Sequence, residues 1–202
     1  MTMYSSSLTY PKPRLTFLRT FLQNPVGIGS ITPSSRSLAR EMVRGLELKS
    51  GETVLEFGPG TGSFTSQIQR IIPDPSAYLG IECEPAFVRL LSRRFPDLDF
   101  VAAPAENVKT IYEQSGLEPI RAIISGLPST GVKSSVHDLI LESIESLMTP
   151  GCIFRTFQYV HTYWLPSAVR FRKKMSRIYG RHYRSRAVLR NVPPAFVLTW
   201  TR

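Results

Sequence analysis

The segment at residues 54–64 reads VLEFGPGTGSF and carries three glycines at alternate positions. Its apolar beginning is typical of a buried strand, and a helical pattern follows at residues 63–72. Glycines at such a junction permit positive φ angles and let a ligand approach the backbone N–H groups at the start of a helix. The segment therefore predicts a strand, a ligand-binding loop and a helix in succession.

Strand-like and helical segments alternate after Gly51, and a helix that precedes it is expected to have Thr32 as N-cap and Pro33 at its first position. The candidate strands are 53–57, 77–82, 98–102, 120–125, 152–158, 186–190 and 195–200. Helices are expected near 63–72, 85–94, 106–115, 133–149 and 166–179. This alternation favours an α/β fold with a mostly parallel seven-stranded sheet and helices on both faces. Because the link at 191–194 is too short for a helical crossover, we expect the last two strands to form an antiparallel pair at the end of the sheet.

At 202 residues the chain is long enough for one well-buried domain, which we expect to span residues 1–202. No apolar run approaches the ~18 residues that span a bilayer, and the N-terminus lacks the apolar core of a secretion signal. We therefore expect a cytoplasmic protein. Cys83 and Cys152 lack the spacing of metal ligands, so we expect buried, reduced thiols and predict no metal site.

Positive charge is concentrated at the two ends of the chain. The formal net charge is +10, yet residues 1–40 and 151–202 contain no aspartate or glutamate, and all 15 acidic residues lie between them. This distribution favours an anionic partner, either nucleic acid or a membrane surface. Residues 1–30 are expected to form an N-terminal arm in which residues 14–23 make an amphipathic helix. Such a helix suits a membrane interface or packing on the domain.

Acidic residues accompany the glycine loop. Glu56 precedes the glycines, and the segment AYLGIECE at residues 77–84 ends the second strand with Glu82 and Glu84. A dinucleotide-binding loop would instead have the spacing Gly-x-Gly-x-x-Gly. A carboxylate beside the loop repels a pyrophosphate and attracts a cation such as an amine, whereas an acid at the end of the second strand binds ribose hydroxyls. The pattern predicts a nucleoside ligand with an amino-acid or sulfonium head.

This combination resembles the S-adenosylmethionine site of class I methyltransferases, over about residues 30–200. The resemblance implies a Rossmann-like class I methyltransferase fold with that cofactor. The cofactor-binding residues that it implies are Glu56, Gly58 and Gly60 for the methionine end, Glu82 for the ribose with Glu84 as second choice, and in addition Gly62 and Ser125. Many family members contact adenine through an Asp-Ala pair after the third strand, where this chain has Pro104 at the aspartate position. Ala105 and Glu106 are then the candidate adenine contacts, although Glu106 can equally be a first-turn acid favoured by the helix dipole.

The segment ISGLPST at residues 124–130 follows the fourth strand and is expected to line the pocket of the methyl acceptor. Ribosomal RNA adenine dimethylases resemble this chain in the glycine loop and in the segment IECE, but their corresponding motif is Asn-Leu-Pro-Tyr or a close variant. The amide and the aromatic ring of that motif hold a flipped adenine. This chain has Gly126-Leu127-Pro128-Ser129 instead, which lacks both groups and argues against an adenine acceptor.

Three further segments resemble the bacterial phospholipid N-methyltransferases, namely FLRTFLQNPVGIGSITPSSRSLAREM at 17–42, SGLP at 125–128 and RNVPPAFV at 190–197. This resemblance implies N-methylation of a phospholipid head group, from phosphatidylethanolamine towards phosphatidylcholine. We expect a monomer, peripheral at the inner face of the membrane, with an anionic membrane surface and a phospholipid as partners. The alternatives are an RNA adenine N6-methyltransferase, an enzyme for another amino lipid such as an ornithine lipid, and a non-catalytic protein of this fold that binds membrane or RNA.

The candidate acceptor residues come from three segments. The carbonyls of Gly126 and Leu127 can accept hydrogen bonds from an amine, and aromatic faces in FQYVHTYW at 157–164 suit a methylated, more cationic amine. The catalytic candidates in this second segment are Tyr159, as first choice for the pocket, and His161, as proton acceptor. The head-group candidates are Tyr163 in FQYVHTYW and, in and beside IYGRHYR at 178–184, Arg177, Tyr179 and His182, with Arg181 and Arg184 as further partners of a phosphodiester. No dedicated base is required, because a nearby sulfonium lowers the pKa of the amine.

Overall fold

The computed structural model describes residues 33–127 and 134–202. The chain divides into two compact units, Met1–Ile31 and Thr32–Arg202, and the described residues all belong to the second unit. The predicted N-terminal arm at 1–30, its amphipathic helix and the proposed Thr32 cap lie outside the described residues. The end of the turn after the fourth strand, residues 128–133, lies outside them too.

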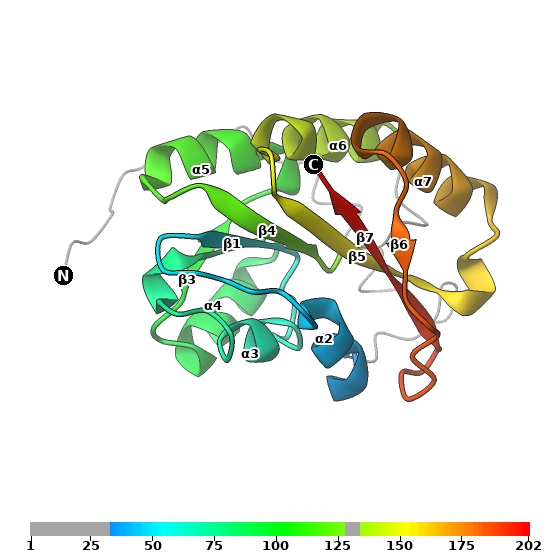
Figure 1. The fold of residues 1–202 in the computed structure, drawn as a ribbon. Helices are drawn as coiled ribbons and strands as arrows, with labels where there is room; N and C mark the ends of the chain where they lie inside the picture. Colours follow the sequence, from blue (N-terminus) through cyan, green and yellow to red (C-terminus); the bar gives the residue numbers. More distant parts are fainter. Residues whose placement is uncertain (1–32, 128–133) are drawn as a thin grey trace. The chain divides into compact units, whose positions relative to one another are not determined.

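The described unit is built on a seven-stranded sheet in the order β3-β2-β1-β4-β5-β7-β6 (Figure 1). Its strands are β1 (Thr53–Phe57), β2 (Tyr78–Glu82), β3 (Asp99–Ala102), β4 (Ile120–Ser125), β5 (Ile153–Tyr159), β6 (Tyr183–Arg184) and β7 (Ala195–Thr201). Strands β1 to β5 are parallel, and β7 lies antiparallel between β5 and β6. The predicted class, a mostly parallel seven-stranded sheet with an antiparallel terminal pair, is confirmed.

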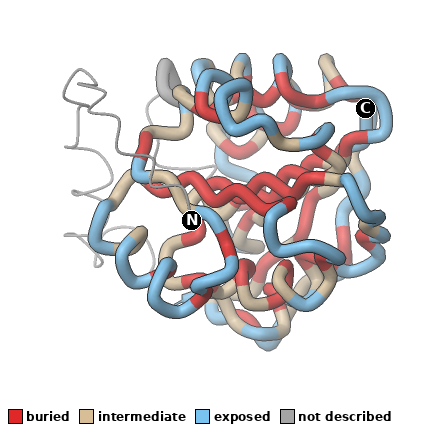
Figure 2. The backbone as a smooth tube through the Cα atoms, turned by 90° about the vertical axis from the view of Figure 1, so that its left-hand side faces the viewer, coloured by how far each residue is buried: buried red, intermediate tan, exposed pale blue. Residues whose placement is uncertain are grey.

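Helices cover both faces of this sheet, as Figure 1 shows. One core joins a face of the sheet to α5 (Val108–Ser115), α6 (Ser134–Leu147) and α7 (Pro166–Tyr179). The second core joins the other face to α2 (Arg36–Val43), α3 (Thr65–Ile68) and α4 (Pro85–Arg94). The short 3-10 helices are η1 (Pro75–Ala77), η2 (Ala105–Asn107) and η3 (Val160–Thr162). The central strands are buried along nearly their whole length between these layers (Figure 2).

Two predicted helix boundaries are wrong for local chemical reasons. The helix after the glycine loop ends at Ile68, since the chain continues in tight turns before Pro73, which cannot extend a helix. Helix α2 begins at Arg36 rather than at Pro33, because the N-cap is Ser35, whose Oγ accepts a hydrogen bond from Leu38 N at 3.1 Å.

The predicted sixth strand at 186–190 is also wrong. Strand β6 is Tyr183–Arg184, and Ser185 then exchanges hydrogen bonds with Val197 through both its backbone N–H and its Oγ. Further along, Val188 forms an isolated bridge to Ala195. A serine side chain that takes the place of a backbone acceptor interrupts the ladder, so the apolar pattern after it does not continue as a strand.

Two backbone turns meet where β1 and β4 end. Gly126 N donates to Phe57 O at 2.8 Å, and a Cβ atom at Gly126 would lie 2.6 Å from Gly58 O. The Leu127 side chain packs over Gly58, where an added Cβ would lie 2.8 Å from Leu127 Cδ2. The glycine loop and the turn after β4 are therefore one packed unit with no room for a side chain between them.

We predict that Gly126→Ala lowers the free energy of unfolding by about 3 kcal/mol, because the new methyl group must push the two turns apart. The matched control is Gly116→Ala. Its Cβ would meet nothing within 4 Å, so it carries only the cost of a left-handed backbone, about 1 kcal/mol. Thermal and denaturant unfolding of both variants measures the difference, and equal destabilisation would contradict the close packing at Gly126.

Candidate functional site

The carboxyl ends of the parallel strands are tied together by backbone hydrogen bonds. Gly58 N donates to Ile81 O at 2.9 Å, and Ala103 N donates to Glu82 O at 3.0 Å. With the bond from Gly126 to Phe57, these contacts align the ends of β3, β2, β1 and β4 in one row. Ligands of open α/β sheets bind at this edge, so the row is the candidate site.

The three glycines of the loop have positive φ angles of 62°, 57° and 85° at Gly58, Gly60 and Gly62. A Cβ atom at Gly62 would lie 2.5 Å from the Phe95 ring, so the third glycine is required for packing against the end of α4. At Gly60 the nearest atom is a backbone oxygen 4.0 Å from the added Cβ. Gly60 is therefore the point at which a ligand can approach the backbone.

The Glu56 side chain is completely buried beneath this loop. Its Oε2 accepts hydrogen bonds from Tyr78 OH at 2.6 Å and from Thr65 Oγ1 at 2.8 Å. Its Oε1 has no hydrogen-bond partner within the described part of the chain. Burial outweighs the two hydrogen bonds and raises the pKa of Glu56 to about 7. A buried carboxylate oxygen without a donor fits a cationic ligand that supplies one.

The strand beside Glu56 makes room for its hydrogen-bond partner. Gly80 pairs with Glu56 in the sheet, and a Cβ atom at Gly80 would lie 2.7 Å from Tyr78 OH and equally close to the Phe100 ring. Tyr78 and Thr65 are partners of Glu56 that the sequence pattern did not predict. A glycine inside a strand pattern was the available signal, because it marks a close approach of another group.

Glu82 is buried at the end of β2 and contacts the glycine loop directly. Its Oε2 accepts from Gly60 N at 3.0 Å, and its Oε1 accepts from Glu84 N at 3.0 Å. The Cys83 thiol also donates to this carboxylate, and burial raises the pKa of the thiol to about 12. A carboxylate accepts about four hydrogen bonds, so Glu82 retains capacity for ligand hydroxyls.

Glu84, the second candidate for the ribose, is the N-cap of α4, and its carboxylate accepts from Ala86 N at 3.4 Å.

Both cysteines are free thiols; Cys152 is buried as expected, whereas Cys83 is only half-buried. In the part of the chain that the structure describes, no cluster of three or more histidine, cysteine or acidic side chains could hold a metal ion.

The candidate adenine contacts lie on η2, just after β3. Ala105 is half-buried against the core beneath α5 and α6, and Glu106 is exposed in the first turn. Glu106 O accepts a hydrogen bond from Ser143 Oγ at 3.1 Å, which ties η2 to α6. Pro104 is the N-cap of η2, so this position supplies no side-chain hydrogen bond.

On the acceptor side, β4 ends at Ser125, which is buried and whose carbonyl accepts from Thr156 Oγ1 on β5 at 3.2 Å. Its hydroxyl accepts from Leu127 N at 3.4 Å. Among the described residues, no donor is bonded to the carbonyls of Gly126 or Leu127. As far as the described residues show, these two carbonyls are therefore acceptors without a donor beside the glycine loop.

An aromatic row leads outward from the loop helix. The Phe64 ring meets Phe157 edge-on at 5.7 Å, Phe157 meets Tyr159 at 5.4 Å, and Tyr159 stacks on His161 at 5.7 Å. Tyr159 is half-buried, with its pKa raised by burial, and His161 is exposed. The structure brings these two candidates to the same edge of the sheet as the glycine loop.

Tyr163 is buried rather than open to solvent. Its ring lies under the Arg172 guanidinium at 3.7 Å, and Arg172 also donates to Gln158 Oε1 at 2.5 Å and to Tyr163 O at 2.8 Å. Neither Arg172 nor Gln158 was predicted from the sequence to have a role here. A lone arginine in a basic helix carries no signal that it is buried.

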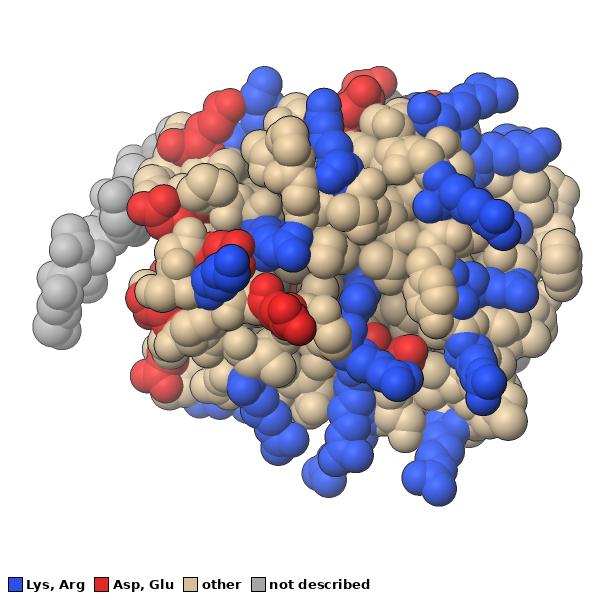
Figure 3. Space-filling model, in the orientation of Figure 1, with Lys and Arg blue, Asp and Glu red and all other residues tan. Residues whose placement is uncertain are grey.

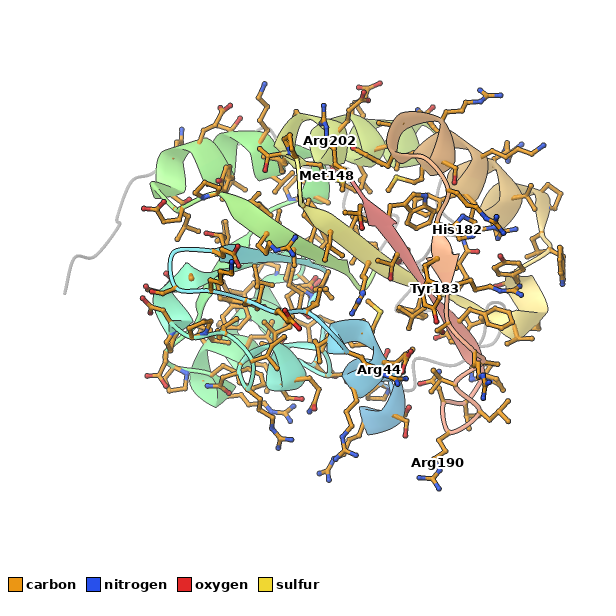
Figure 4. All side chains as sticks on the ribbon, viewed as in Figure 1. Arg44, Met148, His182, Tyr183, Arg190 and Arg202 are labelled. Carbon is orange, nitrogen blue, oxygen red and sulfur yellow. The ribbon has the colours of Figure 1, made fainter. Side chains whose placement is uncertain are left out.

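Three further head-group candidates, Arg177, Tyr179 and His182, lie towards the opposite end of the sheet, whereas Arg184 lies over the Tyr163 ring at 5.1 Å. Trp200 pairs with Phe154 at the beginning of β5, and the His182 ring lies 5.0 Å from Trp200. Tyr179 and Arg177 occupy the last turn of α7, which runs back from the carboxyl edge of the sheet. Figure 4 shows His182 on the side of Arg202, far from Arg190 at the tip of the loop before β7. The structure does not bring Arg177, Tyr179 and His182 to the glycine loop.

The strand order, the glycine loop and the two buried carboxylates are those of the class I methyltransferase fold. No protein-family model matches the chain. The chain is similar to the ornithine lipid N-methyltransferase of Singulisphaera acidiphila, with 28% identity over 186 residues that cover 89% of this chain and 91% of that protein. It is also similar to the ribosomal RNA small subunit methyltransferase A of Chlorobaculum parvum, with 30% identity over 76 residues, or 35% of this chain and 27% of that protein.

Solved structures show the same fold at low sequence identity. A TehB-like SAM-dependent methyltransferase from Corynebacterium glutamicum has a TM-score of 0.58 at 13% identity, covering 92% of this chain and 96% of that chain. Aeropyrum pernix fibrillarin, solved with natively bound S-adenosyl-L-methionine, has a TM-score of 0.57 at 14% identity, covering 82% and 73% of the two chains. These comparisons show the expected class I methyltransferase fold.

The residues present fit S-adenosylmethionine. The open Oε1 of Glu56 suits the cationic amino group, Gly60 permits a close approach, and Glu82 retains acceptor capacity for hydroxyls.

None of the helices in the described ranges is long and apolar enough to cross a bilayer.

We predict opposite effects of Glu56→Gln on stability and on cofactor binding. The native pKa of about 7 lies above the ordinary value of 4.5, so the contribution of Glu56 to stability is complete below pH 4.5 and is lost as the pH rises through 7. The variant is free of this loss, and above pH 7 its unfolding free energy should exceed that of the unmodified protein by up to about 3 kcal/mol. Its affinity for S-adenosylmethionine should fall by about a hundredfold, because a charged hydrogen bond is lost.

Denaturant unfolding between pH 5 and 8 and titration calorimetry measure the two effects. The control is Glu47→Gln, which removes an exposed carboxylate and should change neither quantity. Unchanged cofactor affinity in the Glu56→Gln variant would remove Glu56 from the binding site.

Proposed function

We propose that this protein is an S-adenosylmethionine-dependent N-methyltransferase that acts on the amine of a lipid head group. The observation that carries the proposal is the close packing of Gly126 and Leu127 on the glycine loop, in a turn whose sequence, Gly-Leu-Pro-Ser, has neither an amide nor an aromatic ring. The similarity to a lipid N-methyltransferase over 89% of the chain supports the same acceptor class.

The cofactor, when bound, supplies an electrophilic methyl group. Glu56 holds its amino group, the loop backbone at Gly60 lies against it, and Glu82 binds the ribose. The two carboxylates are fixed before binding by Tyr78, Thr65 and the loop backbone, so little reorganisation is needed.

The acceptor amine must be neutral to attack the methyl group. The carbonyls of Gly126 and Leu127 accept hydrogen bonds from its N–H groups and orient its lone pair along the line of transfer. The positive charge of the sulfonium lowers the pKa of the amine, so no strong base is required. Positioning then supplies much of the rate.

The half-buried face of Tyr159 forms the outer wall of the acceptor pocket. Each methyl group that is added removes a hydrogen-bond donor and makes the amine more cationic, so an aromatic face becomes the better partner. The stacked His161 ring holds Tyr159 in place from the solvent side.

We predict that Tyr159→Ala lowers kcat/KM for the lipid amine by about tenfold and leaves cofactor affinity unchanged, because the ring contacts the acceptor alone. Tyr159→Phe should retain activity, since the aromatic face remains. Steady-state kinetics with radiolabelled cofactor, together with calorimetry, measure both. Equal activity of the alanine and phenylalanine variants would exclude an aromatic contact.

Two lipids offer the kind of amine that the proposed acceptor site would bind. The resemblance to phospholipid N-methyltransferases favours phosphatidylethanolamine, whereas the curated relative is an ornithine lipid enzyme. Both present a primary amine next to an anionic or polar linkage. The match to a ribosomal RNA methyltransferase covers 35% of the chain, so RNA is the weaker candidate.

Labelled S-adenosylmethionine decides among these acceptors when it is incubated with the protein and, separately, phosphatidylethanolamine, ornithine lipid, total lipid and total RNA. We expect label in a lipid fraction, and the pure lipids identify the head group. Label in RNA alone would overturn the proposal. Cofactor binding without transfer to any fraction would indicate a non-catalytic protein.

A further inference from the structure

Four large apolar side chains are exposed at the carboxyl edge of the sheet. Trp164 is 76% exposed and Leu165 45% exposed after η3, and Leu189 is 74% exposed and Val192 73% exposed in the loop before β7. We name these four residues the apolar tips. Exposing so much apolar surface at two neighbouring loops is costly in water and marks an interaction site.

The two loops that carry the apolar tips leave the sheet side by side. Tyr159, the last residue of β5, pairs with Ala195, the first residue of β7. Val160 N then donates to Pro194 O at 2.8 Å, so the chain after β5 and the chain before β7 are joined at the edge itself. Both loops therefore project beyond the end of the sheet where the glycine loop also opens.

Basic side chains surround the tips. Residues 151–202 contain no aspartate or glutamate, and their exposed basic residues include Arg170, Lys173, Arg184, Arg186 and Arg190. Within the described ranges none of these five has a carboxylate partner. Figure 3 shows lysine and arginine gathered over the half of this face that contains α7, β6 and β7, and Figure 4 shows Arg190 at the tip of the loop before β7.

We propose that the apolar tips insert into the head-group region of an anionic phospholipid bilayer, with the surrounding arginines and lysines on its surface. Tryptophan and leucine among basic side chains, on loops of a segment that contains no acidic residue, are the side chains that favour such an interface. Apolar side chains on two neighbouring loops suit a deformable bilayer. The identification of a bilayer as the partner rests on the proposed lipid substrate. The exposure of the apolar tips and the positive charge around them are independent of that proposal.

This docking places the candidate acceptor pocket against the lipid. Tyr159 and His161 lie on the chain between the end of β5 and Trp164. A head group at the membrane surface thus reaches the pocket from the side of the apolar tips, and the amine enters between the aromatic row and the turn after β4. The lipid tails need not leave the bilayer.

The two tryptophans of the chain make the test direct, because Trp164 is 76% exposed and Trp200 is 1% exposed. Full-length protein is mixed with vesicles of phosphatidylglycerol and phosphatidylcholine, or of phosphatidylcholine alone. We expect the emission to shift to shorter wavelength with the anionic vesicles and to lose the shift in Trp164→Phe. An unchanged emission of bound protein would overturn the insertion of Trp164.

Vesicle cosedimentation tests whether the loop before β7 contributes to vesicle binding. Leu189→Ser should weaken partition into anionic vesicles by about tenfold, since a fully inserted leucine is replaced by a polar group. The matched control is Leu90→Ser on α4, which removes another exposed leucine and should bind as the unmodified protein does. Equal binding of both variants would contradict the proposal, and unchanged thermal unfolding shows that both are folded.

A comparison of vesicles with detergent micelles separates docking from catalysis. If the protein methylates lipid, Leu189→Ser should lose activity on vesicles and keep it on mixed micelles with the same cofactor affinity. Insertion of Trp164 without methylation of any lipid would refute the proposed function and leave the docking surface standing. Methylation of lipid with no effect of either tip variant on vesicle binding would refute the docking surface alone.

Discussion

The buried carboxylate of Glu56 is the constraint around which the site is built. Removing a carboxylate from water is costly, and two hydroxyl donors on one of its oxygens offset only part of the cost. The neighbouring strand adapts to it, since Gly80 leaves space for the Tyr78 hydroxyl. The raised pKa expresses the remaining strain. A cationic ligand that donates to the free oxygen of Glu56 would offset this burial cost. The carboxylate thus lowers the stability of the unliganded protein at a position where it favours binding of a cation.

The second constraint is steric and lies between two turns. Gly58 and Gly126 are in contact through backbone atoms, and Leu127 closes over the loop. A Cβ atom at Gly126 would collide with Gly58 O, so the described part of this turn meets the glycine loop through backbone and the Leu127 side chain. Under the proposed function, such a surface would suit a slim amine that donates hydrogen bonds better than a purine.

Much of this arrangement could be predicted from the sequence, because it depends on local patterns. The alternation of strands and helices, the glycine loop and the acids Glu56 and Glu82 are all visible in short segments. Contacts between distant segments are not. Nothing near Arg172 shows that it will be buried over Tyr163, and the apolar pattern at 186–190 gives no sign that Ser185 ends the ladder. Residue type alone predicts Arg177, Tyr179 and His182 at the site, but α7 carries Arg177 and Tyr179 to the far end of the sheet, and His182 follows them beside Trp200.

Charge is arranged in opposite senses inside and outside the site. Its interior holds two buried carboxylates, whereas the half of the molecule around α7, β6 and β7 is basic. The basic half of the molecule attracts an anionic surface at long range. The buried carboxylates attract an ammonium or sulfonium group once that group has left water. A zwitterionic or amino lipid carries both charges on one head group, so it meets both fields in a single orientation. Under the proposed function, the amine would point at the glycine loop and the anionic linkage would stay near the arginines, the orientation that methyl transfer to nitrogen requires.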